Sequence, residues 1–146
     1  MRLTSLAYYS SMALQGPHQV NDILKTARKN NKIEMITGSL VYDGQYFLQV
    51  LEGARTAVTD LFLRISNDPR HLGCRLMTVV DIPERRFSDW EMGFVDLEMG
   101  KRDLIKRYSS VDNFLPEHFE SRGFVELIHK ISNTPGAVVG SATLAA

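Results

Sequence analysis

The pattern of apolar and polar residues predicts a β-hairpin in the first third of the chain. Two apolar, β-prone runs, 36–42 and 45–51, are separated by an Asp-Gly pair. This pair is typical of a two-residue hairpin loop, because both central residues of a type I′ turn have positive φ. A two-residue loop would place Gly38 opposite Gln49. Both faces of the second run are apolar, so we expect a central strand with Gln49 in the core.

A buried Gln49 needs a hydrogen-bond partner, since an unpaired carboxamide costs about 1–3 kcal/mol. Gly38 has no side chain, so the predicted pairing leaves a slot beside a group that both donates and accepts. A flat, partly polar ligand would fill this slot. The other interpretation is a protein partner for Gln49, with Gly38 at a β-bulge. The pattern alone leaves both open.

Helical spacing of apolar residues predicts two helices around this hairpin. Apolar residues recur at i, i+3, i+4 and i+7 within 20–27, and a second stripe follows within 58–65. Asn30 and Asn31 are suited to a C-terminal cap, so we expect the first helix to end there.

Alternating positions predict three further strands. The first is expected at 3–9 and the fourth at 76–82. A fifth is expected within 85–94. Because alternate residues of a strand point to the same face, three large side chains would share one face: Trp90, Met92 and Phe94.

The order βαββαβ predicts an α+β, ferredoxin-like fold with an extra fifth strand, in which two helices cover one face of the sheet. Two C-terminal helices would cover the other face, the first around Leu104, Ile105 and Tyr108 and the second around Phe124, Leu127, Ile128 and Ile131. We expect a core domain over 1–96, a two-helix extension over 97–132 and a disordered tail over 133–146.

Composition narrows the class of protein. The 146 residues carry 17 Lys and Arg against 17 Asp and Glu, so net charge gives no reason to expect nucleic-acid binding. Apolar runs are too short to cross a membrane. Cys74 is the single cysteine, which excludes an internal disulfide. We expect a cytoplasmic protein that binds no membrane.

Familiar catalytic motifs are missing from the sequence. It contains no phosphate-binding glycine loop, and the histidines lack metal-ligand spacing, so no metal site is predicted. Arg64, Asp68 and His71 leave one enzymatic interpretation open, a small ferredoxin-like enzyme acting on a phosphorylated or acyl substrate.

Six short motifs follow one another between residues 3 and 95. They are Tyr8 with Ser10, Lys29-Asn30-Asn31, Ile36-Thr37-Gly38, Phe47-Leu48-Gln49-Val50-Leu51-Glu52-Gly53, Asp68-Pro69-Arg70-His71, and Arg86-Phe87 before Trp90-Glu91-Met92. With these motifs the chain resembles a short, stand-alone BLUF domain, the blue-light sensor that uses FAD. It departs from the resemblance at Met35, where that family usually has glycine.

The resemblance implies roles for individual residues. Tyr8 would give an electron and then a proton to the excited flavin, and Gln49 would bridge Tyr8 to the flavin. Trp90 and Met92 would relay the change through the fifth strand. The implied cofactor contacts are Tyr8, Ile23, Lys29, Asn30, Asn31, Ile36, Phe47, Gln49, Arg64, Asp68 and His71.

The hypothesis from the sequence is therefore a photoreceptor that binds FAD noncovalently and has no enzymatic turnover. Light would rearrange the hydrogen bonds of Gln49, and the signal would pass through strand five and the C-terminal helices. We expect a homo-oligomer and a separate downstream signalling protein. Besides the small enzyme, a thermal flavin electron carrier and a structural interaction module remain as alternatives.

Overall fold

The computed structural model describes residues 2–12, 17–97, 106–107, 116 and 119–138. Within these residues the chain forms five strands and three helices. They are β1 (Leu3–Met12), α1 (Pro17–Glu34), β2 (Thr37–Tyr42), β3 (Tyr46–Ala54), α2 (Arg55–Ser66), β4 (His71–Ile82), β5 (Gly93–Asp96) and α4 (Ser121–Ser132).

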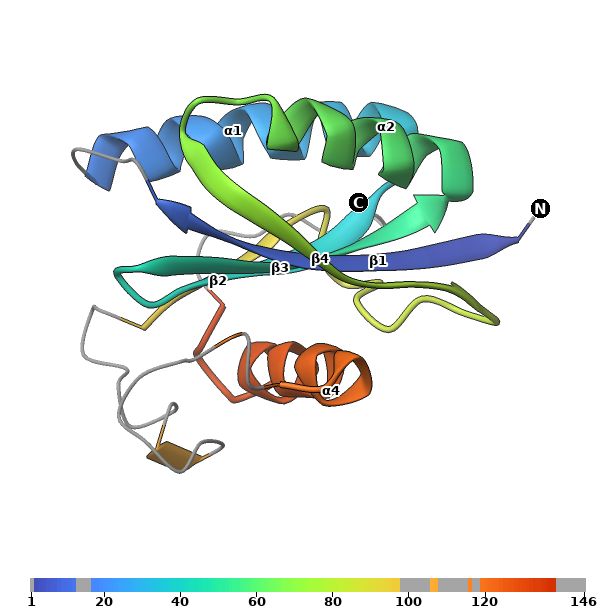
Figure 1. Ribbon diagram of the computed structural model, residues 1–146. Helices are drawn as coiled ribbons and strands as arrows, with labels where there is room; N and C mark the ends of the chain where they lie inside the picture. The colour runs from blue at the N-terminus through green and yellow to red at the C-terminus, as the bar shows by residue number, and fades with distance from the viewer. Residues whose placement is uncertain (1, 13–16, 98–105, 108–115, 117–118, 139–146) are drawn as a thin grey trace.

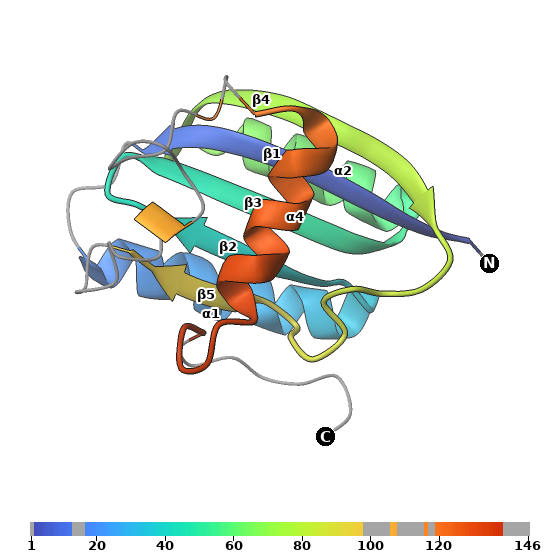
Figure 2. The same cartoon turned by 90° about the horizontal axis from the view of Figure 1, so that it is seen from below.

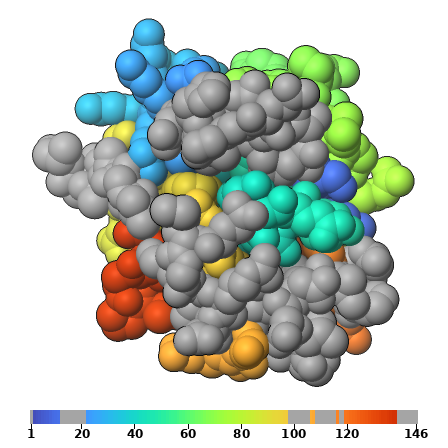
Figure 3. All heavy atoms as spheres, turned by 90° about the vertical axis from the view of Figure 1, so that its left-hand side faces the viewer, coloured from blue at the N-terminus to red at the C-terminus, as the bar shows by residue number. Residues whose placement is uncertain are grey.

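The five strands form one sheet in the order β4-β1-β3-β2-β5, in which β5 pairs parallel to β2 and the other neighbours are antiparallel. Helices α1 and α2 lie together on one face of this sheet, and α4 crosses the opposite face (Figure 1, Figure 2). Figure 3, a space-filling view from the left-hand side of Figure 1, shows blue and green residues above, teal residues in the middle, and orange and red residues below. The predicted ferredoxin-like α+β fold is confirmed.

Each face of the sheet buries its own apolar cluster. The cluster under α1 and α2 includes Tyr8, Leu40 and Leu51, and the cluster under α4 includes Leu48 and Val50. This division follows from strand alternation, because neighbouring residues of β3 point to opposite faces. The four apolar residues predicted for the last helix, Phe124, Leu127, Ile128 and Ile131, are all buried on the α4 side.

Other parts of the C-terminal prediction fall partly outside the described chain. Leu104, Ile105 and Tyr108, predicted to form a further helix, lie outside the described residues. Of the predicted tail, 133–138 is described, and Ala137 is buried in the α4-side cluster. The helices of the described residues include none that is long and apolar enough to cross a membrane.

The predicted two-residue hairpin loop is wrong. Tyr42 pairs with Phe47, so the pairing is shifted by two positions and Leu40, not Gly38, lies opposite Gln49. The cause is Asp43, whose side-chain Oδ1 accepts hydrogen bonds from the backbone N–H groups two and three residues on, at 2.9 and 2.7 Å. A shift of two residues keeps every side chain on its predicted face, so Gln49 remains in the core.

Gly38 has a different role from the predicted slot. A Cβ atom at this position would lie 1.9 Å from the carbonyl oxygen of Val50. Its backbone N–H donates to the carbonyl of Trp90 at 3.2 Å. The glycine therefore permits close approach of backbone on the neighbouring strand, and a side chain here would not fit.

The predicted fifth strand is also placed wrongly. The strand begins only at Gly93, so Trp90 and Met92 precede it, and they lie on opposite sides of the sheet. The backbone before Gly93 is irregular because its carbonyls bond to groups outside a ladder. The Glu91 carbonyl accepts from Asn31 Nδ2 at 2.8 Å, and the Met92 carbonyl accepts from Arg28 Nε at 3.0 Å.

The first helix runs past its predicted end at Asn30-Asn31 by three residues, to Glu34. Met35 follows it with φ of 56°, and the N–H of Ile36 donates to the carbonyl of Asn31 at 2.8 Å. This geometry is a Schellman ending, in which the residue after the helix adopts the left-handed conformation that glycine favours.

Replacing Met35 with glycine should stabilise the protein. The left-handed conformation costs an L-residue roughly 1–2 kcal/mol, and the greater entropy of unfolded glycine offsets part of the gain, so we expect a net increase of about 0.5–1 kcal/mol. Met35 is 61% exposed, so little packing is lost. Urea unfolding measures the change. The control is Ile33→Gly, an exposed site inside α1, which should destabilise; equal effects of both variants would contradict the backbone explanation.

Candidate functional site

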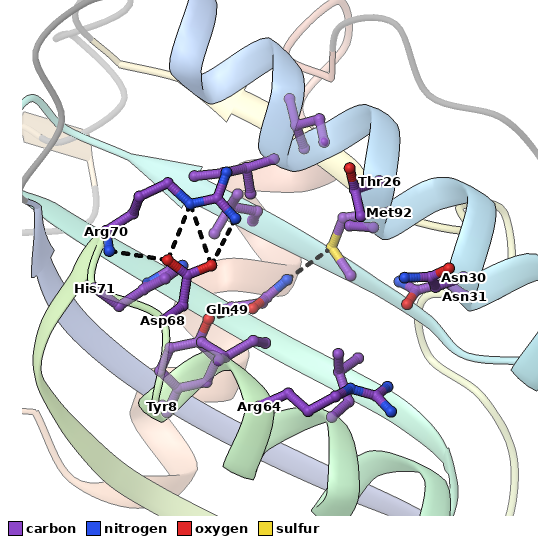
Figure 4. Close-up of a pocket in the computed structure, with 16 residues that line it drawn as sticks. Tyr8, Thr26, Asn30, Asn31, Gln49, Arg64, Asp68, Arg70, His71 and Met92 are labelled. Carbon is purple, nitrogen blue, oxygen red and sulfur yellow. Dashed lines mark hydrogen bonds and ion pairs between the residues drawn. The ribbon is translucent and has the colours of Figure 1, made fainter.

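A cavity of about 220 Å³ lies between α1 and α2, above the middle of the sheet. The residues that line it come from both helices, from strands β1 to β4, from the turn after α2 and from the segment before β5 (Figure 4). The lining residues are Tyr8, Ile23, Leu24, Thr26, Ala27, Asn30, Asn31, Leu40, Gln49, Leu61, Arg64, Ile65, Asp68, Arg70, His71 and Met92.

The floor of the cavity holds a chain of three buried side chains. The phenol of Tyr8 donates a hydrogen bond to Gln49 Oε1, and Gln49 Nε2 donates to Met92 Sδ at 3.2 Å (Figure 4). Tyr8 and Gln49 are paired directly across β1 and β3, which explains why the two side chains meet. Gln49 thus uses both ends of its amide within the protein.

The phenol of Tyr8 is held in its neutral form. Burial raises the pKa of Tyr8 well above its usual value of 10.0, and the nearby Cys74 and Asp68 raise it further. A neutral phenol keeps its proton available for the hydrogen bond to Gln49.

Asn31 has one unsatisfied polar atom. Its Nδ2 donates to the Glu91 carbonyl, whereas its Oδ1 is buried without a hydrogen-bond partner. No other buried side-chain oxygen or nitrogen in the described part of the chain lacks a partner. Because an unpaired buried acceptor is costly, this oxygen is suited to accept a hydrogen bond from an N–H group of a ligand in the cavity.

Asp68 and Arg70 form the charged pair of the cavity wall. Arg70 Nη2 donates to Asp68 Oδ2 at 2.5 Å, and the Arg70 backbone N–H donates to Asp68 Oδ1 at 2.9 Å. These hydrogen bonds lower the pKa of Asp68 to about 2. Arg64, on α2, forms an ion pair with Glu34 at 3.3 Å and lies near the end of α1.

His71 is buried beside the Tyr8 ring. Its Nδ1 lies 2.9 Å from Ser10 Oγ, and its ring centroid is 5.1 Å from that of Phe47. Burial lowers the pKa of His71 to about 4, against a contribution from Asp68 in the other direction. The ring is therefore neutral near pH 7.

Most of the residues singled out from the sequence meet at this cavity. Those that line it are Tyr8, Ile23, Asn30, Asn31, Gln49, Arg64, Asp68, His71 and Met92. Four others do not line it. Ile36 and Phe47 are fully buried in the cluster below, Lys29 is exposed, and Trp90 packs against the α4-side cluster.

The sequence reasoning gave no role to Thr26 and Arg70, which also line the cavity. Features of the sequence could have identified both residues. Thr26 lies three residues after Ile23 and four before Asn30, so these residues share one face of α1. Arg70 belongs to the Asp-Pro-Arg-His motif, and it pairs with an acid two residues away.

The sheet contributes a neutral tyrosine and a buried amide to the cavity, and α1 contributes the unpaired acceptor of Asn31. This arrangement is typical of a binding domain for a flat, partly polar ligand. A family model described as sensors of blue light using FAD matches residues 3–93. The chain belongs to this family, the BLUF domains, and the resemblance inferred from the six motifs is confirmed.

Relatives and solved structures agree with this family. Photoactivated adenylate cyclase subunit beta of Euglena gracilis is 30% identical over 125 residues, which cover 78% of this chain and 15% of that protein. The blue light- and temperature-regulated antirepressor BluF of Escherichia coli (strain K12) is 31% identical over 104 residues, 70% of this chain and 26% of that protein. The dark state structure of BlrB, a BLUF protein, matches with a TM-score of 0.74 and 34% identity over 88% of this chain and 96% of that one.

The buried His71 should make the protein less stable in acid. Unfolded histidine takes up a proton near pH 6.5 and the folded ring only near pH 4, so acidification between these values favours unfolding. The free energy of unfolding should fall by about 2–3 kcal/mol more in the wild type than in His71→Gln between pH 7 and pH 4.5. Urea titrations at both pH values measure this; parallel losses in the two proteins would show that His71 is not responsible.

Proposed function

We propose that this chain is a blue-light photoreceptor that holds FAD noncovalently and signals through a change in the hydrogen bonds of Gln49. The observation that carries the proposal is the buried chain from the Tyr8 phenol through the Gln49 amide to Met92 Sδ, in the floor of the cavity. Its two ends lie on different elements, so a change in Gln49 alters how the segment before β5 is held.

The cavity residues fit the ring system of a flavin. The cavity, at about 220 Å³, is smaller than the roughly 300–1,000 Å³ of common ligand sites, so it suits the flat ring rather than the whole cofactor. The unpaired Oδ1 of Asn31 would accept the ring imide N–H, and Ile23 would contact a ring face. Asn30, Arg64 and Asp68 would contact its polar edge, and His71 would close the end near Tyr8.

The bound flavin would supply the absorption of blue light and an acceptor for one electron. Tyr8 would give an electron to the flavin and then its phenolic proton by way of the hydrogen-bonded Gln49 amide, and the return of both to Tyr8 would leave Gln49 in a new hydrogen-bond state. Gln49 would meanwhile exchange its donor and acceptor ends, which a glutamine can do without a change of charge. The new arrangement would no longer donate to Met92 Sδ as Gln49 Nε2 does here.

FAD rather than FMN or riboflavin is our proposal for the cofactor, with support from the description of the family. The Arg70 guanidinium at the wall is one cation that could contact a phosphate group. Lys29, exposed one residue before Asn30 on α1, is a second cation for the part of the cofactor outside the cavity.

The signal would pass to another protein. The relatives named above are a cyclase subunit and an antirepressor, and this chain spans only 15% and 26% of their lengths. We propose a separate effector as the partner of this chain, a homo-oligomeric assembly and a cytoplasmic location.

Replacing Tyr8 with phenylalanine tests the electron donor. The variant should purify yellow, because phenylalanine keeps the aromatic ring and the flavin would still bind. It should lose the reversible red shift of the flavin spectrum under blue light, because the phenol is missing. Spectra recorded in darkness, under illumination and again in darkness measure this. The matched control is Tyr9→Phe, which removes the adjacent phenol on the α4 side.

The same spectra separate the competing functions. A small enzyme or an interaction module would purify colourless, and a thermal electron carrier would bleach under light without recovering the dark spectrum. A normal photocycle in Tyr8→Phe would rule out the donor assignment. Acid extraction and chromatography of the bound flavin would decide between FAD and FMN.

A further inference from the structure

The irregular segment between β4 and β5 is attached firmly at its pocket end. Gly38 N, Asn31 Nδ2 and Arg28 Nε hold three successive carbonyl groups of this segment, those of Trp90, Glu91 and Met92. The Met92 side chain ends at Gln49. A change at Gln49 therefore acts on this end of the segment first.

Glu52 holds the other end of the segment. It lies on β3 three residues after Gln49, so its side chain points to the opposite face of the sheet. The Glu52 residue is 1% exposed. Its Oε2 accepts from the backbone N–H of Arg86 and its Oε1 from that of Phe87, both at 2.8 Å.

Neighbouring side chains brace this carboxylate. Thr37 Oγ1 donates to Glu52 Oε1 at 3.3 Å. The Arg85 guanidinium donates to Thr37 Oγ1 at 2.8 Å and to the backbone carbonyl of Glu52 at 2.9 Å. Burial raises the pKa of Glu52 above its usual value. The two backbone hydrogen bonds, Thr37 and Arg85 offset only part of this rise. The ends of β2 and β3 are thus tied to residues 85–87.

The residues that Glu52 holds are those that contact α4. Arg86 Nη1 forms an ion pair with Glu126 Oε1 at 2.6 Å, and the Phe87 ring packs edge-on against the ring of His129 at 5.4 Å. Glu126 and His129 are three residues apart, so they lie on one face of α4. The segment therefore joins the floor of the cavity to this face of α4.

We propose that Glu52 is the positioning residue that couples the cavity to α4, an inference that rests on the proposed light-driven change at Gln49. Its carboxylate fixes the backbone of Arg86 and Phe87 to β3. Because the segment is held at both ends, a displacement of Met92 strains the residues between Phe87 and Met92, and this strain reaches α4 through the Phe87 and Arg86 side chains. Without this anchor, residues 85–87 slide and the displacement does not reach α4.

The anchor requires a carboxylate. Two backbone N–H groups point at the two oxygens, and both are donors. A glutamine offers one acceptor oxygen and one NH₂ group, so one N–H would face another donor. Glu52→Gln therefore keeps the shape of the side chain and breaks one attachment of the segment.

The test compares hydrogen exchange of the α4 amides in darkness and under blue light, in the full flavin-loaded chain. In the wild type, light should change exchange in α4 by about fivefold or more, the lower range of ordinary allosteric couplings. In Glu52→Gln the flavin red shift should persist while this light-dependent change is lost. The matched control is Asp81→Asn, an exposed carboxylate that pairs with Arg2 and Arg55; it should respond as the wild type does.

Each outcome bears on a separate claim. Absence of a flavin red shift in the wild type would overturn the proposed function itself. A normal red shift with an unchanged α4 response in Glu52→Gln, or with no α4 response in the wild type, would overturn the inference about Glu52 alone. If Glu52→Gln fails to fold, Thr37→Val serves, since it removes the hydroxyl that braces the carboxylate; it should weaken the α4 response at least about twofold, and an undiminished response would again overturn the inference.

Discussion

The structure depends on the hydrogen bonds that join Tyr8, Gln49 and Met92. All three side chains are buried, so each polar end must find a partner inside the protein. The amide of Gln49 supplies both, an acceptor for the phenol and a donor for the sulfur. Because these partners come from β1, from β3 and from the segment before β5, one amide connects three parts of the chain.

The titratable groups beside the hydrogen bonds of Tyr8, Gln49 and Met92 are either neutral or paired. Burial favours the neutral form of both Tyr8 and His71, and the acidic Asp68 is already paired with Arg70 on the wall. A neutral floor allows proton and hydrogen-bond changes at low energetic cost, whereas an isolated charge in the same place would be expensive. Among the described residues, the one buried side-chain acceptor without a partner, Asn31 Oδ1, lies on the helix that covers the cavity.

Strand β3 contributes a polar side chain to each face of the sheet. Gln49 points towards the cavity between α1 and α2, and Glu52 points towards α4. The segment between β4 and β5 passes from one face to the other, with Met92 on the cavity side and Phe87 and Trp90 on the α4 side. One short segment of backbone therefore contacts both the cavity and the face of α4.

The sequence by itself determined the order of the elements, the faces of the central strand and most of the cavity residues. Periods of 2 and 3.6 are local properties, and a register error of two residues left every face unchanged. The six short motifs also indicated the BLUF family. Only the tertiary structure decided the hairpin pairing, the start of β5 and the opposite placement of Trp90 and Met92. The hairpin pairing follows from hydrogen bonds of the Asp43 side chain, which the apolar pattern does not show. The start of β5 and the placement of Trp90 and Met92 depend on hydrogen bonds between distant residues: Asn31 to Glu91, Arg28 to Met92 and Glu52 to Phe87. No periodicity along the chain records a bond of that kind.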